Sequence, residues 1–94
     1  MKIIGLPILQ TFKTRHADLR GPLEAWQTVI EKESWGSPQE VKECYRSVDI
    51  LSGNRLIFNL KGNAYRLLVQ VSYRNGIVVI EWVGTHAEYS KRIF

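Results

Sequence analysis

Residues 55–85 have the sequence RLIFNLKGNAYRLLVQVSYRNGIVVIEWVGT, and this stretch decides the fold. Apolar side chains alternate with polar ones at period two, which is typical of strands with one buried face. The expected strands cover 55–60, 64–73 and 77–83. Gly62-Asn63 and Asn75-Gly76 separate them, and Asn-Gly is the strongest short signal for a type I′ hairpin turn. The stretch therefore predicts a three-stranded antiparallel meander.

The residues before this stretch have helical spacing. We expect a first helix over roughly 8–16 and a second from Leu23 to about residue 34, because its apolar positions form one stripe. Ser37, Pro38 and Glu40 together indicate the start of a third helix. Residues 2–6 are extended and could add a further strand. The prediction is one α+β domain over residues 1–94, with the helices packed on one face of a small antiparallel sheet.

The composition limits the kinds of partner and site that the chain can have. The chain has 94 residues, is 45% hydrophobic and carries a formal charge of +4, which favours an anionic partner such as nucleic acid or an acidic protein. Its single cysteine, Cys44, is interpreted as a small buried hydrophobe, and it excludes an internal disulfide or a multi-cysteine zinc site. No apolar run approaches the roughly 18 residues of a membrane helix. We expect a cytoplasmic protein without a membrane partner.

The predicted turns set the strand register. In the first hairpin, Leu60 faces Tyr65 and Asn59 faces Arg66. If Asn75 and Gly76 form a two-residue loop in the second, Val69 faces Trp82, Gln70 faces Glu81 and Arg66 faces Thr85. Thr85 and Glu88 match a capping box that begins a short terminal helix. This register predicts that the helix cap lies beside Arg66.

One end of one sheet face would then gather six polar side chains: Asn59, Lys61, Arg66, Thr85, His86 and Tyr89. Such a set suits a phosphate, because Arg66 and Lys61 could neutralise it. His86 has a side chain suited to proton transfer, and Tyr89 could donate, accept or stack on a base.

Each residue also has a structural interpretation. Arg66 could be an exposed strand arginine paired with Glu81 or Glu88. His86 could be a surface residue, Lys61 a turn lysine and Tyr89 an anchor of the terminal helix. The three tryptophans, Trp82 included, are expected to be packing residues.

Two motifs give the chain a family resemblance. They are F-N-x-x-G-N-x-Y-R-L over residues 58–67 and T-H-x-E-Y over residues 85–89. With this spacing, and with LEAWQTVIEKESW and SPQEVKECYRSVDIL in the same order upstream, nearly the whole chain resembles the HigB toxins of bacterial type II toxin–antitoxin systems.

The resemblance implies a RelE-like fold with a short C-terminal helix. It also implies a ribosome-dependent mRNA endonuclease that arrests translation and growth without a metal or other cofactor. Its implied partners are mRNA on the ribosome and a helix-turn-helix, HigA-like antitoxin. The toxin would contact operator DNA only through this antitoxin.

Carried onto this chain, the resemblance assigns catalysis to Arg66, His86 and Tyr89. Arg66 would stabilise the transition state, and His86 or Tyr89 would transfer protons. RNA binding falls to Lys61, Asn59, Asn63 and Thr85. Asn59 and Thr85 would also orient Arg66 and cap the last helix.

A different class of function stays open. The same fold could serve a binding protein without nuclease activity, such as a gyrase-type poison, a decayed toxin that holds its antitoxin, or an RNA-binding module.

Overall fold

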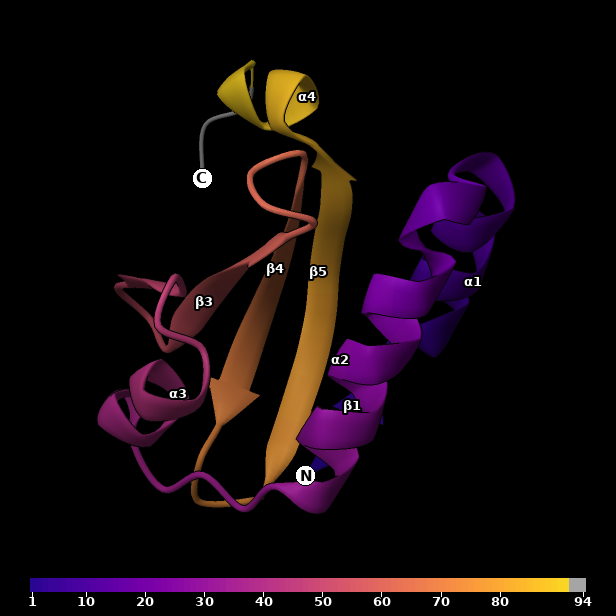
Figure 1. Ribbon diagram of the computed structural model, residues 1–94. Coiled ribbons are helices and arrows are strands. Elements are labelled where there is room, and N and C mark those ends of the chain that lie inside the picture. The colour runs from indigo at the N-terminus through magenta and orange to yellow at the C-terminus, as the bar shows by residue number, and fades with distance from the viewer. Residues whose placement is uncertain (92–94) are drawn as a thin grey trace.

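The computed structural model describes residues 1–91, and its helices and strands form an α+β fold (Figure 1). The predicted fold class is confirmed. In chain order the elements are β1 (Lys2–Ile4), α1 (Leu6–Arg15), the 3-10 helix η1 (Ala17–Leu19), α2 (Arg20–Lys32), α3 (Pro38–Cys44), β2 (Asp49–Leu51), β3 (Arg55–Leu60), β4 (Tyr65–Ser72), β5 (Ile77–Thr85) and α4 (His86–Ser90).

The sheet has five strands in the order β1-β5-β4-β3-β2. The predicted meander forms its centre. The N-terminal strand is present, but it pairs with β5 in parallel, so the sheet is mixed. Strand β2 was not predicted, since three residues before the Ser52-Gly53-Asn54 loop are too few for a periodic signal; it pairs antiparallel with β3.

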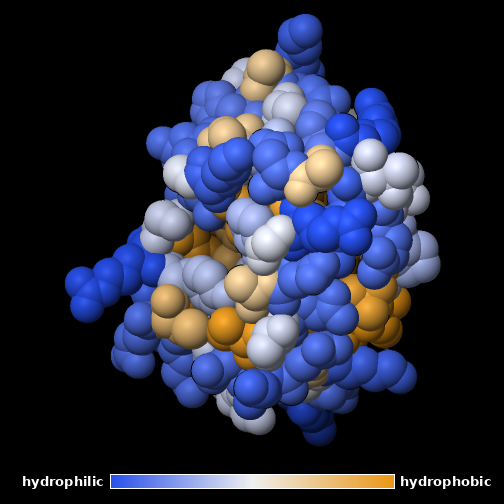
Figure 2. All heavy atoms as spheres, turned by 45° about the vertical axis from the view of Figure 1, so that its right-hand side comes forward, coloured by the Kyte–Doolittle hydropathy of each residue, from blue (hydrophilic) through white to orange (hydrophobic). Residues whose placement is uncertain are grey.

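Helices α1, α2 and α3 share one hydrophobic core with one face of the sheet. Leu9 of α1, Leu23 and Trp26 of α2, and Val41 of α3 are buried with Phe58 of β3. Gly5 makes the sharp passage from β1 to α1, because its φ of 101° lies in the region that favours glycine. Exposed apolar side chains are scattered, and the face in Figure 2 is largely hydrophilic with small, separate apolar groups.

The first hairpin has the predicted register: Leu60 pairs with Tyr65 and Asn59 with Arg66. Its connection is the four residues 61–64, in which Lys61 and Gly62 have positive φ. A four-residue connection keeps the same faces as a two-residue one.

The second hairpin differs from the prediction. The type I′ turn at Asn75-Gly76 was wrong, because Asn75 does not have the positive φ that this turn requires. Four residues connect the strands instead, so Ser72 pairs with Ile77 and Val69 with Ile80. The register then shifts: Leu68 pairs with Trp82, which leaves Glu81 as the extra residue of a β-bulge.

The bulge reverses the faces of β5 from Trp82 onward, because side chains alternate along a strand. Val83 turns to the core, where it is 8% exposed, whereas Trp82 and Gly84 turn to the open face with Arg66. The predicted pairing of Arg66 with Thr85 was therefore wrong. Arg66 lies opposite Gly84, and Thr85 lies opposite Tyr65.

The structure also differs from the predictions in the starts of two helices and in the exposure of Cys44. Helices α1 and α2 begin two or three residues earlier than predicted, and Ser37 and Pro38 start α3 as expected. Cys44 is exposed rather than buried, because it ends α3 while Val41 faces the core. Among residues 1–91, no helix is both long and apolar enough to cross a bilayer.

Candidate functional site

Arg66 is the centre of the candidate site. It projects from β4 on the face that α1, α2 and α3 do not cover, and its side chain is 18% exposed. Its Cζ atom lies 4.4 Å from the centroid of the Tyr89 ring, which is a cation–π contact. Its Nη1 atom lies 4.0 Å from Asp49 Oδ2, at the limit of an ion pair. The guanidinium is thus held between β2 and α4.

Asn59 is the cross-strand neighbour of Arg66. Its Nδ2 atom donates to the Ser47 carbonyl oxygen at 2.7 Å. Asn59 Oδ1 and Arg66 Nε are both shielded from solvent and have no hydrogen-bond partner among residues 1–91. Buried polar groups normally have partners, so this unpaired acceptor and donor on neighbouring strands are available to a ligand.

Helix α4 positions Tyr89 against Arg66, and its start is fixed by a complete capping box. The Thr85 N–H donates to Glu88 Oε1 at 2.8 Å, and the Glu88 N–H donates to Thr85 Oγ1 at 3.1 Å. These bonds with Thr85 hold the pKa of Glu88 below its usual value, and they confirm the predicted cap. Thr85 and Glu88 are therefore occupied in fixing the turn that carries Tyr89.

Trp82 also belongs to this open face, with its ring centroid 6.2 Å from that of Tyr89 and tilted by 46°. The indole lies over the backbone of Gly84. A Cβ atom on Gly84 would come within 2.4 Å of Trp82 Cζ2, so this position needs glycine for lack of space.

The structure thus brings Arg66, Asn59 and Tyr89 together, with Thr85 capping the helix. His86 begins α4, three residues before Tyr89; its imidazole is exposed, and none of residues 1–91 hydrogen-bonds to it. Asn63 is exposed in the β3–β4 turn. Lys61 points elsewhere, with its Nζ atom 2.9 Å from Asp18 Oδ2.

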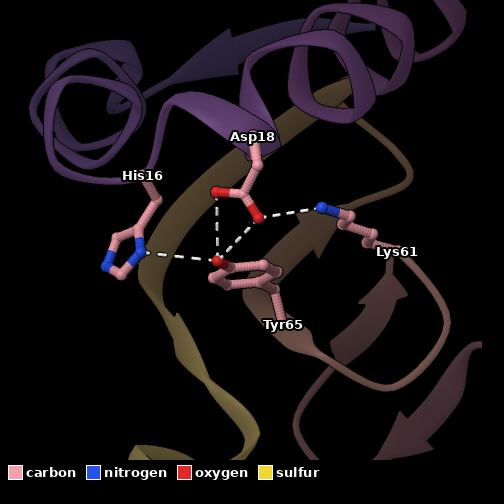
Figure 3. A network of polar contacts seen from close by, with 4 residues as sticks. All are labelled: His16, Asp18, Lys61 and Tyr65. Carbon is pink, nitrogen blue, oxygen red and sulfur yellow. Dashed lines mark hydrogen bonds and ion pairs between the residues drawn. The ribbon is translucent and has the colours of Figure 1, made fainter.

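That Asp18 contact belongs to a second polar network, which joins η1 to the β3–β4 turn (Figure 3). The Tyr65 hydroxyl donates to Asp18 at 3.0 Å and lies 3.4 Å from His16 Nδ1. The hydrogen bonds from Lys61 and then from Tyr65 lower the pKa of Asp18. The network satisfies its own charges, which favours a structural role over a catalytic one.

Residues 19–92 match the model of the HigB_toxin family, described as the RelE-like toxic component of a toxin–antitoxin system. The chain belongs to the HigB toxin family. No curated protein gave a significant match to it.

Membership in the HigB family accounts for the fold, because a mixed sheet with helices on one face and a short C-terminal helix is consistent with a RelE-like toxin. It also implies that this HigB-family chain has an antitoxin partner.

Two residues of this HigB-family site were missed in the sequence. Asp49 was overlooked because β2 was not predicted, so only Glu81 and Glu88 were considered as acidic partners of Arg66. Trp82 was assigned to packing because a regular ladder places it on the core face. The sequence did contain one signal that alternation fails there. Regular alternation places the apolar Val83 on the open face and places Gly84, which has no side chain, on the core face.

Proposed function

We propose that this HigB-family toxin is a ribosome-dependent mRNA endonuclease that arrests translation and growth. The observation that carries the proposal is the Arg66 guanidinium, fixed on Tyr89 with a buried Nε donor that has no partner among residues 1–91. A planar, permanently charged fork of donors suits the oxygens of a phosphodiester.

The proposed reaction uses the RNA's own 2′-hydroxyl as nucleophile, so it needs no metal or other cofactor. A base removes the 2′-hydroxyl proton and the 2′-oxygen attacks the adjacent phosphorus. The bond to the 5′-oxygen breaks, and that oxygen receives a proton from an acid. The products are a 2′,3′-cyclic phosphate and a free 5′-hydroxyl. Arg66 stabilises the charge that develops on the phosphoryl oxygens.

Proton transfer is assigned to His86 and Tyr89, which lie on the same short helix. Asn59, the cross-strand neighbour of Arg66, is assigned to RNA binding, and Thr85 holds α4. Lys61 and Asn63, at the tip of the β3–β4 turn, contact the RNA backbone further along. For Lys61 this requires release from Asp18, an exposed ion pair of the kind that contributes little to stability.

The family's description as one half of a toxin–antitoxin system supports the partners that we propose. A helix-turn-helix, HigA-like antitoxin neutralises the toxin in the cytoplasm, and it alone contacts operator DNA in their complex.

The test is expression of the wild type, Arg66→Ala and Arg74→Ala in bacteria, with mRNA integrity followed by primer extension. We expect growth arrest and cleaved mRNA for the wild type and for Arg74→Ala, whose side chain is exposed in the β4–β5 turn. Arg66→Ala should lower cleavage by about 10²- to 10³-fold, as for loss of a transition-state donor. Growth arrest with intact mRNA in the wild type would instead favour the binding-only function.

A second pair of variants tests the proton transfer. We expect His86→Ala and Tyr89→Phe each to slow cleavage, with folding checked by circular dichroism. Wild-type rates in both variants would remove these residues from the chemistry while leaving the role of Arg66 intact.

A further inference from the structure

Trp82 occupies an unusual place for a tryptophan of this chain. Trp26 and Trp35 are 1% and 4% exposed and belong to the core, whereas Trp82 lies partly exposed on the open face. The bulge at Glu81 is what turns it outward. Bulges often re-aim a side chain next to a functional site.

The indole packs against two neighbours, Gly84 and Tyr89. Because Gly84 has no side chain, the ring lies directly over the β5 backbone, and a Cβ there would also come within 2.6 Å of Trp82 Cη2. Tyr89 flanks it at 6.2 Å between ring centroids. An aromatic surface fixed before binding loses little conformational entropy when a ligand stacks on it.

A charged group and two aromatic rings are neighbours on the open face. The Arg66 guanidinium contacts the Tyr89 ring, and the Tyr89 ring is next to the Trp82 ring. A cationic group that binds the backbone, beside aromatic rings that take the bases, is the arrangement used to bind single-stranded nucleic acid.

We propose that Trp82 is a nucleobase-stacking residue, and that the ligand of this face is single-stranded RNA whose base lies against the indole while Arg66 binds the adjoining phosphate. A duplex does not fit this role, because the faces of its bases are covered by their neighbours, whereas an unstacked base offers its π-face. The proposal rests on the proposed function, since it names how the same site holds its substrate.

The probe is a fluorescein-labelled single-stranded RNA that is 2′-O-methylated throughout, so that no 2′-hydroxyl can attack. A second strand of equal length and charge lacks all its bases. Binding of wild type, Trp82→Phe and Trp82→Leu to both strands is measured by anisotropy, with Ile4→Ala on β1 as control.

We expect the wild type to prefer the strand with bases. Trp82→Leu should lose roughly tenfold or more in affinity for that strand and little for the abasic one, which corresponds to one base–aromatic stack. Trp82→Phe should keep part of the preference, and Ile4→Ala all of it. Equal losses on both strands, or no loss, would overturn the proposal.

Intrinsic fluorescence gives a second measurement that needs no leucine variant. Adding the strand with bases should quench part of the wild-type tryptophan emission and none in Trp82→Phe, because Trp26 and Trp35 are buried. Equal quenching in both proteins, or no quenching in the wild type, would also overturn the proposal that Trp82 stacks on a base. Base-dependent quenching without mRNA cleavage in cells would refute the nuclease alone, whereas cleavage without a Trp82 effect would refute stacking alone.

Discussion

At the residue scale, the critical position is Gly84, whose backbone lies beneath the Trp82 indole. Its hydrogen leaves room for a flat aromatic ring, and no other residue does so without moving that ring. Arg66, Tyr89 and Trp82 are neighbours on the open face, so displacement of the indole changes the surroundings of all three.

We therefore predict that Gly84→Ala destabilises the protein by about 1–3 kcal/mol, the usual cost of overpacking. Gly21→Ala is the matched control, because nothing lies within 4 Å of a Cβ there and the position is helical. It should stabilise by about 0.5–1 kcal/mol. Urea denaturation of both variants measures the difference, and a neutral Gly84→Ala would contradict the packing that we describe.

At the element scale, α4 is too short to be stable by itself, since isolated helices need about 12–15 residues even with good sequences. Its five residues are held by the capping box and by the contact of Tyr89 with Arg66. The pKa of Glu88 is lowered because its carboxylate accepts from the Thr85 N–H. The charged form thus stabilises the folded turn above the ordinary pKa of 4.5, and this stabilisation is lost as the pH falls through the lowered pKa.

We predict that the NMR shift of the Thr85 amide proton follows a single titration with its midpoint below 4.5. In Glu88→Gln the side chain still accepts the Thr85 N–H but cannot titrate, so this transition should vanish while α4 remains formed. A midpoint at or above the ordinary value, or an unchanged titration in the variant, would show that Glu88 does not hold the cap.

At the scale of the whole molecule, the polar network of His16, Asp18, Lys61 and Tyr65 joins the helical layer to the sheet at the end where α4 begins (Figure 3). A backbone hydrogen bond joins α4 to the same β3–β4 turn, because the His86 N–H donates to the Ala64 carbonyl oxygen at 3.0 Å. The network therefore steadies the end of the sheet from which the site is built.

We predict that Tyr65→Phe lowers the melting temperature by a few degrees and leaves mRNA cleavage near the wild-type rate. Tyr73→Phe is the control: its hydroxyl is buried without a partner among residues 1–91, so its loss should be neutral or stabilising. Calorimetry and the cleavage assay separate the two effects. A large loss of cleavage at unchanged stability would place Tyr65 in the chemistry instead.

The sequence by itself determined the local features. Period-two alternation marked β3, β4 and β5, the Thr85–Glu88 spacing marked the start of α4, and the motifs around Arg66 marked the family. These signals are readable because each depends on residues a few positions apart along the chain.

Tertiary structure decided which side chains meet. A β-bulge at Glu81 reverses the faces of β5, so Trp82 joins Arg66 and Thr85 does not. Strand β2 brings Asp49 to Arg66, and Asp18 draws Lys61 away. One extra residue in a strand changes the local sequence pattern little, yet it moves every later side chain of that strand to the opposite face. An ion pair between residues far apart in the sequence forms only because packing of the layers makes them neighbours.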